Sequence, residues 1–227
     1  MQRKGWCLLP HTIRRQSVAR ATAWVDAAAA SPSPDLEREF EPESLGGRLA
    51  VRKIRRLNWH DLRAWDRPLD EFGLRPLPLL CVGPSLQPLL LFHTAFLKSG
   101  CVTTAIGLRQ DQGLRDDEHP AAISMWVVLS RSTRFDGCLE MSSGSHRSGR
   151  LPHRRQPGHP WHACAAPAAH GLLEPTAIEM QAGDVLVWDR HLVHGRGGNH
   201  SSRDRKSVVM VFPPSAGGAL PLPCGSS

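Results

Sequence analysis

The chain has 227 residues, of which 41% are hydrophobic, and it carries a formal net charge of +7 with a sequence pI of about 9.6. This length and composition are typical of a globular protein with one well-packed core, so we expect a single domain over residues 1–227. The basic residues are spread over loops, without a nucleic-acid-binding motif or interleaved aromatic residues. This pattern argues against a nucleic-acid partner despite the positive charge.

The cysteine usage and the apolar segments predict a reduced, cytoplasmic protein. The six cysteines show no C-x-x-C spacing and follow no secretory signal, which disfavours disulfides and a zinc site; they are Cys7, Cys81, Cys101, Cys138, Cys164 and Cys224. The most apolar stretch, 76–97, contains four prolines, which are incompatible with a regular membrane-spanning helix. We therefore expect no membrane partner.

The first thirty residues allow two interpretations. They are basic, with Asp26 as the first acidic residue, as in a transit peptide. However, residues 5–10 have the pattern of a short strand, and apolar side chains recur at helical spacing within 12–30. We favour this structural interpretation and expect a helical N-terminal part over about 1–75, with a further helix-like pattern over 59–72.

Short strands separated by glycine-rich turns dominate the rest of the chain. Residues 51–57 fit a strand or a short helix, and 89–97 fit a buried strand. Further strand-like runs are 101–111, 122–129, 138–141, 177–180, 184–188 and 207–212. This order predicts a mainly β fold with flanking helices, a β-sandwich or jelly roll with its core over about 89–213.

Residues 147–170 differ from the rest because they are basic and rich in histidine and proline. Their weak apolar periodicity predicts a surface loop rather than a core element. A lid over a pocket is a more specific interpretation of the same pattern. Metal binding by His153, His159 and His162 is a weaker alternative, because their spacing is irregular.

Four polar residues are candidates for one pocket. In a strand, Arg109 and Asp111 share a face and Gln110 points to the other. His194 precedes a glycine-rich turn, and Arg205 leads into the last apolar run. A histidine and an aspartate suit a metal, and an arginine suits a carboxylate.

Three segments together resemble the phytanoyl-CoA dioxygenase family. Residues 108–113, L-R-Q-D-Q-G, are similar to its W-H-Q-D-Q-G/A segment. Residues 136–147, with D-G-C-L and S-G-S-H-R, are similar to its N-G-C-L and P-G-S-H-R segments. Residues 183–205 are similar to its final G-D-V, H-G-S-G-x-N and R segment. The order and spacing agree over about 96–212, and the resemblance implies a double-stranded β-helix, a cupin-like jelly roll.

The resemblance also implies an activity and a set of site residues. Members hydroxylate small molecules with Fe(II), 2-oxoglutarate and O₂, holding iron by two histidines and one carboxylate. By matching position, Asp111 and His194 become metal ligands, and Arg205, with Arg203 as the alternative, binds 2-oxoglutarate. Ser207 and Lys98 are further cofactor-binding candidates; Gln110, Trp126 and His146 are candidates for substrate contact or for support of the site.

One position departs from the family pattern: Arg109 stands where the family has its first metal-binding histidine. A guanidinium has no lone pair for a metal, and its fixed charge repels Fe²⁺. Iron could be held by the remaining ligands with a rescuing His119 or His146, or the change could be a single-position variant of an otherwise normal enzyme. Alternatively, Arg109 pairs with Asp111, and the chain is a catalytically impaired member that acts as a binding or partner subunit.

Overall fold

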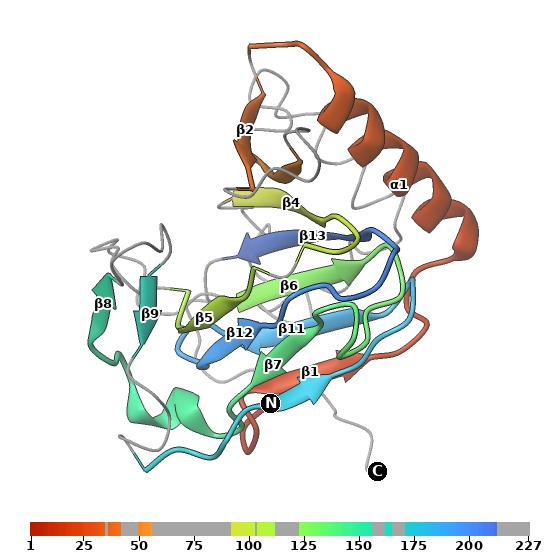
Figure 1. Cartoon of the computed structure of the whole chain (residues 1–227). Helices are drawn as coiled ribbons and strands as arrows, with labels where there is room; N and C mark the ends of the chain where they lie inside the picture. Colours follow the sequence, from red (N-terminus) through yellow and green to blue (C-terminus); the bar gives the residue numbers. More distant parts are fainter. Residues whose placement is uncertain are drawn as a thin grey trace.

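The computed structural model describes residues 1–34, 36–41, 50–55, 92–102, 104–111, 123–155, 162–164 and 171–212. Two antiparallel sheets face each other to form a jelly roll (Figure 1). The larger sheet has the order β1 (Trp6–Leu9), β11 (Val185–Asp189), β6 (Ile123–Val128), β13 (Arg205–Phe212), β4 (Phe92–Lys98), β3 (Val51–Arg55) and β2 (Glu37–Phe40). The smaller sheet has the order β10 (Thr176–Ile178), β7 (Leu139–Met141), β12 (His194–Arg196) and β5 (Ile106–Arg109). The predicted mainly β jelly roll is confirmed.

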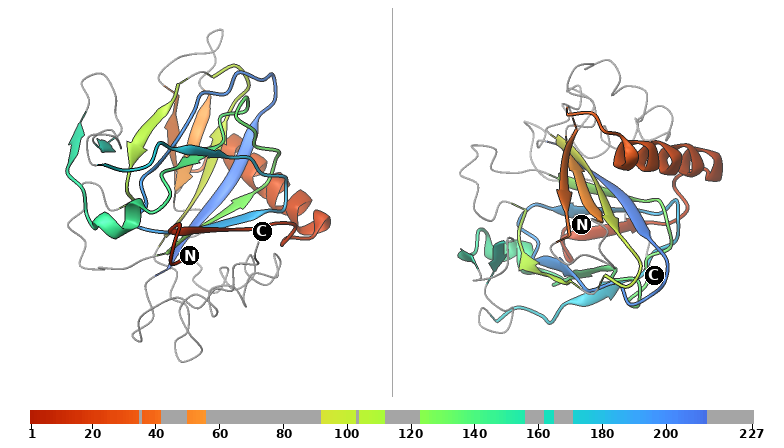
Figure 2. Two further views of the ribbon diagram at one scale, coloured as in Figure 1. Left: turned by 90° about the horizontal axis from the view of Figure 1, so that it is seen from below. Right: turned by 45° about the horizontal axis from the view of Figure 1, so that its top comes forward.

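The helix α1 (Arg15–Ala30) covers the outer face of the larger sheet (Figures 1 and 2). Its buried apolar residues are Val18, Ala21, Val25 and Ala28, at the spacing that places them on one helical face. They join one core cluster with alternate residues of β6 and β13, among them Met125, Val127 and Met210. The structural interpretation of 12–30 is thus the correct one for the fold, and the serine and proline at 31–32 follow the end of the helix.

The other face of the larger sheet forms a second core with the smaller sheet. Trp126, Val128 and Trp188 belong to this cluster, together with Leu139 and Met141 of β7. Because side chains alternate along a strand, the two faces of β6 are divided between the two cores. The same alternation turns the odd-numbered residues of β13, from 205 onward, toward the space between the sheets.

Several local predictions are corrected by the structure. For 51–57, where a strand and a short helix were both open, the structure has a strand at 51–55 that pairs with β4 on one side and β2 on the other. The strands β2 and β12 were not predicted, since neither is apolar enough to stand out. The supposed loop 147–170 includes part of a 3₁₀ turn (Ser145–Ser148) and a hairpin of β8 (His153–Arg155) and β9 (His162–Cys164). The helix-like pattern of 59–72 lies outside the described residues.

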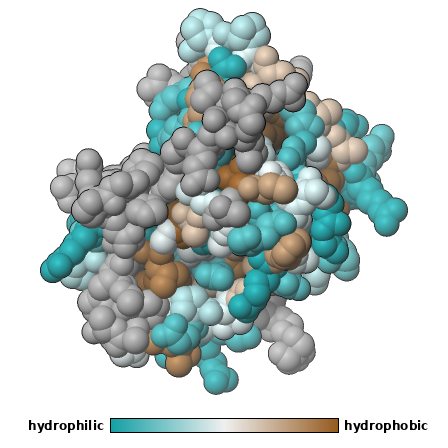
Figure 3. All heavy atoms as spheres, viewed as in Figure 1, coloured by the Kyte–Doolittle hydropathy of each residue, from teal (hydrophilic) through white to brown (hydrophobic). Residues whose placement is uncertain are grey.

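Within the described ranges, no helix is long and apolar enough to cross a bilayer. The face shown in Figure 3 carries its hydrophobic residues as separate patches between hydrophilic ones. The described cysteines with free thiols are Cys7, Cys101 and Cys138.

Candidate functional site

Strand register brings the predicted residues together from both sheets. His194 of β12 is paired with Arg109 of β5 across the smaller sheet. In the larger sheet, Arg205 of β13 is paired with Lys98 of β4, and two residues farther on Ser207 is paired with Phe96.

Asp111 and His194 form the core of the metal-type half of the site. His194 Nε2 lies 3.4 Å from Asp111 Oδ1, and the histidine is 2% exposed. The other ring nitrogen, Nδ1, lies 3.0 Å from the carbonyl oxygen of Leu192. A carbonyl can only accept, so Nδ1 carries a proton and donates to Leu192, and Nε2 is the ring nitrogen that faces Asp111. This orientation is the one that a metal ligand needs.

The second oxygen of Asp111 is held by two donors from the larger sheet. The hydroxyl of Ser124 donates to Oδ2 at 2.5 Å, and the indole Nε1 of Trp188 donates to the same atom at 2.9 Å. Burial alone raises the pKa of Asp111, but His194, the Ser124 hydroxyl and the charge of Arg109 together hold that pKa below its usual range. The carboxylate is therefore ionised and fixed in position.

The pairing of Arg109 with Asp111 stays a prediction, and direct contacts to this carboxylate come from three other residues. Its hydrogen-bond and ion-pair partners are His194, Ser124 and Trp188. Arg109 acts on it through its positive charge. Ser124 and Trp188 were missed in the sequence because they lie inside apolar runs; for Ser124, its shared strand face with Trp126 was the available signal.

Gln110 points away from Asp111, as alternation predicted, and anchors the neighbouring segment. Its amide nitrogen donates to the carbonyls of Gly149 and His191, and its side-chain oxygen accepts from the backbone N–H of Leu151. Its own backbone N–H donates to Nε2 of His153 at 2.9 Å. Gln110 thus fixes the start of the β8–β9 hairpin to the strand end that carries Asp111.

Arg205 forms the carboxylate-type half of the site. It is 1% exposed, and its Nη1 donates to the carbonyl oxygen of Gly137. Its Nε and Nη2 are buried and have no hydrogen-bond partner among the described residues. Gly137 has φ +72°, and a Cβ there would lie 2.6 Å from two backbone oxygens, so glycine is required for this close approach.

The other predicted cofactor residues surround Arg205. The Nζ of Lys98 donates to the carbonyl of Thr104, and burial together with the charge of Arg196 lowers the pKa of Lys98 to about 7, although Glu41 opposes the shift. The hydroxyl of Ser207 is weakly held, at 3.5 Å from the carbonyl of Phe96. Nearby, the ring of Trp126 lies under the Arg205 guanidinium, with 5.9 Å between its centroid and the guanidinium carbon.

Aromatic rings connect the two halves. The ring centroids of His194 and Trp188 are 5.3 Å apart, and those of Trp188 and Trp126 are 6.2 Å apart. Trp126 then contacts Arg205, so the rings provide a continuous path of contacts between the halves. The predicted inward position of Trp126 agrees with this arrangement.

The sequence model of the phytanoyl-CoA dioxygenase family matches residues 1–207. This chain belongs to the phytanoyl-CoA dioxygenase family. A curated relative, a probable phytanoyl-CoA dioxygenase of Caenorhabditis elegans, is 29% identical over 89 residues. That alignment covers 37% of this chain and 28% of the relative, so the chain matches little more than a quarter of that protein's length.

Several solved structures share the fold of this chain. AviO1 from Streptomyces viridochromogenes is 19% identical with a TM-score of 0.68, covering 96% of this chain and 94% of its own. The α-ketoglutarate-dependent carbocyclase SnoK is 18% identical with a TM-score of 0.71, covering 94% and 81%. EvdO2 from Micromonospora carbonacea, solved with 2-oxoglutarate, is 20% identical with a TM-score of 0.67, covering 100% and 94%.

The family's iron centre does not fit the residues present. Among the described residues, no group of three or more histidine, cysteine, aspartate or glutamate side chains is arranged to hold a metal. Asp111 and His194 provide two ligands, and Arg109 occupies the register position opposite His194. The predicted rescuing residue His146 packs against Gly5 instead, and the other candidate, His119, lies outside the described residues.

The family's 2-oxoglutarate, in contrast, does fit. The unpaired Nε and Nη2 of Arg205 are two buried donors of one planar guanidinium, which suits a carboxylate. The alternative residue, Arg203, has a side chain that is 57% exposed and pairs with Asp136 at 3.2 Å. Arg205 is therefore the better placed of the two for a buried carboxylate.

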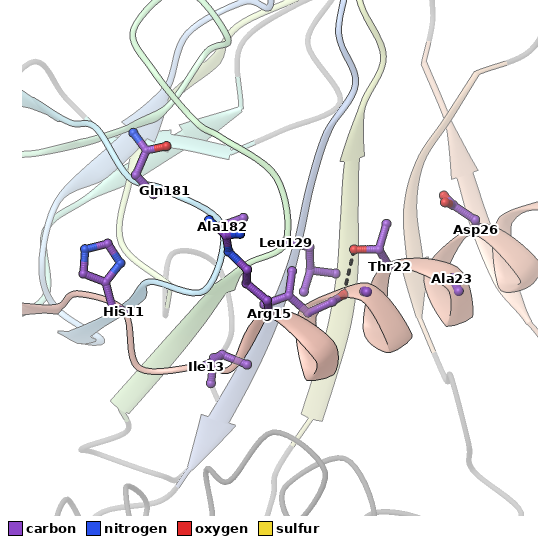
Figure 4. Close-up of a pocket in the computed structure, with 11 residues that line it drawn as sticks. His11, Ile13, Arg15, Thr22, Ala23, Asp26, Leu129, Gln181 and Ala182 are labelled. Carbon is purple, nitrogen blue, oxygen red and sulfur yellow. Dashed lines mark hydrogen bonds between the residues drawn. The ribbon is translucent and has the colours of Figure 1, made fainter.

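A separate hollow of about 920 Å³ lies beside α1 on the outside of the larger sheet (Figure 4). Among its lining residues are His11, Arg15 and Asp26. It shares none of the residues of the site between the sheets. The hollow is therefore separate from the site between the sheets.

Proposed function

We propose that this chain is an oxygenase-type protein of its family that binds 2-oxoglutarate through Arg205 and has an incomplete iron centre. The family activity, hydroxylation of a small molecule with Fe(II), 2-oxoglutarate and O₂, is then weak or absent in the native chain. Restoring the missing ligand by Arg109→His restores iron binding. The substrate is a small organic molecule, and the family name does not identify it.

The observation that carries this proposal is the buried, half-satisfied guanidinium of Arg205. One of its nitrogens is used by Gly137, while Nε and Nη2 have no partner among the described residues. Buried polar groups are normally hydrogen-bonded, and leaving one unpaired costs about 1–3 kcal/mol, more for a charged group. A bound carboxylate removes that cost by accepting two parallel hydrogen bonds.

The metal-type half supports the second part of the proposal. Asp111 and His194 are held in the orientation of ligands by Ser124, Trp188 and the Leu192 carbonyl. A facial triad requires a third ligand, and Arg109 supplies a positive charge at that position instead. The half is thus organised for a metal but lacks one donor.

Anaerobic titration with Fe(II) and 2-oxoglutarate tests the proposal, with the visible metal-to-ligand charge-transfer band as the readout. We expect no band, or a band only at high Fe(II), for the native chain, and a saturable band for Arg109→His. Arg109→Gln is the matched control, because it removes the charge without adding a ligand. A lack of any band in Arg109→His would overturn the assignment of Asp111 and His194.

A second candidate function is turnover by the native chain, with iron held by two protein ligands and by 2-oxoglutarate itself. The fixed geometry of Asp111 and His194 favours it, because these ligands need no rearrangement to meet a metal. Succinate formed from 2-oxoglutarate under air is the readout. Succinate production by the native chain that Asp111→Asn abolishes would establish this second candidate.

A further inference from the structure

Arg196 is a second buried arginine between the sheets, and the sequence motifs did not identify it. It lies two residues after His194 on β12, so both side chains leave the same face of the smaller sheet. Arg196 is 5% exposed, and its Nε has no hydrogen-bond partner among the described residues. Its guanidinium carbon lies 4.5 Å from the ring centroid of Phe96 on the opposite sheet.

Arg196 and Arg205 lie against the same pair of stacked rings. The centroids of Phe96 and Trp126 are 5.2 Å apart with an angle of 22° between the ring planes. Arg196 contacts Phe96 and Arg205 contacts Trp126. The two guanidiniums are thus arranged around one aromatic wall, and both leave N–H donors unused.

Around this wall, Arg196, Arg205 and Lys98 all feel the charge of one buried carboxylate, Glu41. Arg196 is buried, and the positive charges of Arg205 and Arg109 act on it. Glu41 acts on both Arg196 and Arg205 in the opposite sense. In the described part of the chain, no carboxylate forms a direct ion pair with Arg196 or with Arg205.

Such an arrangement is unfavourable unless an anion binds to it. Burying a charge without a partner is strongly destabilising. Two separate guanidiniums match a ligand with two carboxylates better than a ligand with one, because each can accept paired hydrogen bonds. In an iron enzyme, the metal ion supplies part of the positive charge that holds such a dianion.

We propose that the site binds a dicarboxylate of the 2-oxoglutarate class without a metal, with Arg205 holding one carboxylate and Arg196 the other. The charge of Arg109 takes the place of the charge that a metal would supply. This inference rests on the proposed function, since it uses the same Arg205 pocket, and it goes further by assigning the second carboxylate and by making binding metal-independent.

Isothermal titration calorimetry in excess EDTA tests the inference with 2-oxoglutarate, glutarate and the monocarboxylate 2-oxobutyrate. We expect both dicarboxylates to bind at least tenfold more tightly than the monocarboxylate. Arg196→Met keeps an apolar stem against Phe96 and removes the charge. It is expected to weaken 2-oxoglutarate binding at least tenfold and to leave 2-oxobutyrate binding within twofold.

Arg205→Met and Arg203→Met complete the series. Arg205→Met is expected to weaken binding of all three acids, and Arg203→Met, a partly exposed arginine two residues away, is expected to change none of them. Thermal unfolding checks the folded state: without ligand, Arg196→Met should melt at the same temperature as the native chain or higher, because an unpaired buried charge is removed. The dicarboxylate-induced rise in melting temperature should shrink in the same variant.

Three results would overturn the inference. They are binding that appears only with a divalent metal, equal affinity of the native chain and Arg196→Met for 2-oxoglutarate, and equal affinity of dicarboxylates and the monocarboxylate. These failures differ from failure of the proposed function. If Arg109→His binds iron and 2-oxoglutarate but the native chain binds 2-oxoglutarate only with a metal, the inference fails and the proposed function stands. Both fail if no variant binds 2-oxoglutarate under either condition.

Discussion

The two halves of the site have opposite hydrogen-bonding states. In the metal-type half, Asp111 and His194 contact each other, and Ser124, Trp188 and the Leu192 carbonyl hold them in place. In the carboxylate-type half, Arg205 uses one nitrogen and leaves two buried N–H groups unpaired. The fold can tolerate Arg109 in place of a metal-binding histidine, because neighbouring residues already satisfy the hydrogen bonds of Asp111 and His194. The guanidinium of Arg205, with two unpaired N–H groups, instead requires a bound acceptor such as a carboxylate.

Removing the open guanidinium should have the largest effect. We expect Arg205→Leu to weaken 2-oxoglutarate binding by about 100-fold, since losing one partner of a buried charged pair costs about 2–5 kcal/mol. Calorimetry measures the change, and Arg203→Leu is the control. If Arg203→Leu loses binding and Arg205→Leu retains it, the clamp has been assigned to the wrong arginine.

The second prediction concerns Gln110, which supports the metal-type half. Gln110→Ala leaves the carbonyls of Gly149 and His191 and the N–H of Leu151 without their partner. We expect a loss of about 2 kcal/mol in the free energy of unfolding. Hydrogen exchange should also show lost protection near residues 149–155. A variant as stable and as protected as the native chain would show that these bonds do not anchor the hairpin.

A smaller effect is expected for Trp188→Phe, which keeps a ring beside His194 and removes the N–H donated to Asp111. Combined with Arg109→His, it should weaken Fe(II) binding about tenfold, the lower end of what such supporting contacts contribute. The charge-transfer titration reports the affinity. Unchanged affinity would mean that Ser124 alone suffices to orient the carboxylate.

The smallest predicted effect is a change in the pH dependence of stability. The pKa of Lys98 is lowered to about 7 in the folded protein from an ordinary value of 10.5. Between these two values the unfolded chain binds more protons, so stability rises with pH over about 7 to 10. We expect Lys98→Met to raise the melting temperature by a few degrees at pH 7 and to reduce this slope. A steeper slope in the variant would contradict the assignment.

Patterns within short segments were enough to predict the elements. The apolar spacing in 12–30 predicted α1, and alternation predicted that Gln110 points away from Asp111, because both signals depend only on local backbone geometry. Polar or very short elements gave no such signal. The strand β12 forms because β5 and β7, which are distant in sequence, provide its hydrogen bonds, whereas β2 and the β8–β9 hairpin pair with strands nearer in the chain.

The sequence by itself determined the family, the jelly roll and the departure at Arg109, because motifs and strand periodicity are patterns of residues close together in the chain. Only the tertiary structure decided which groups meet. Trp188 and Ser124 reach Asp111 from the opposite sheet, and Arg196 lies against Phe96 across the space between the sheets. Contacts between separate strands follow from packing and register rather than from local pattern. The charge state of the site therefore depends on the folded arrangement.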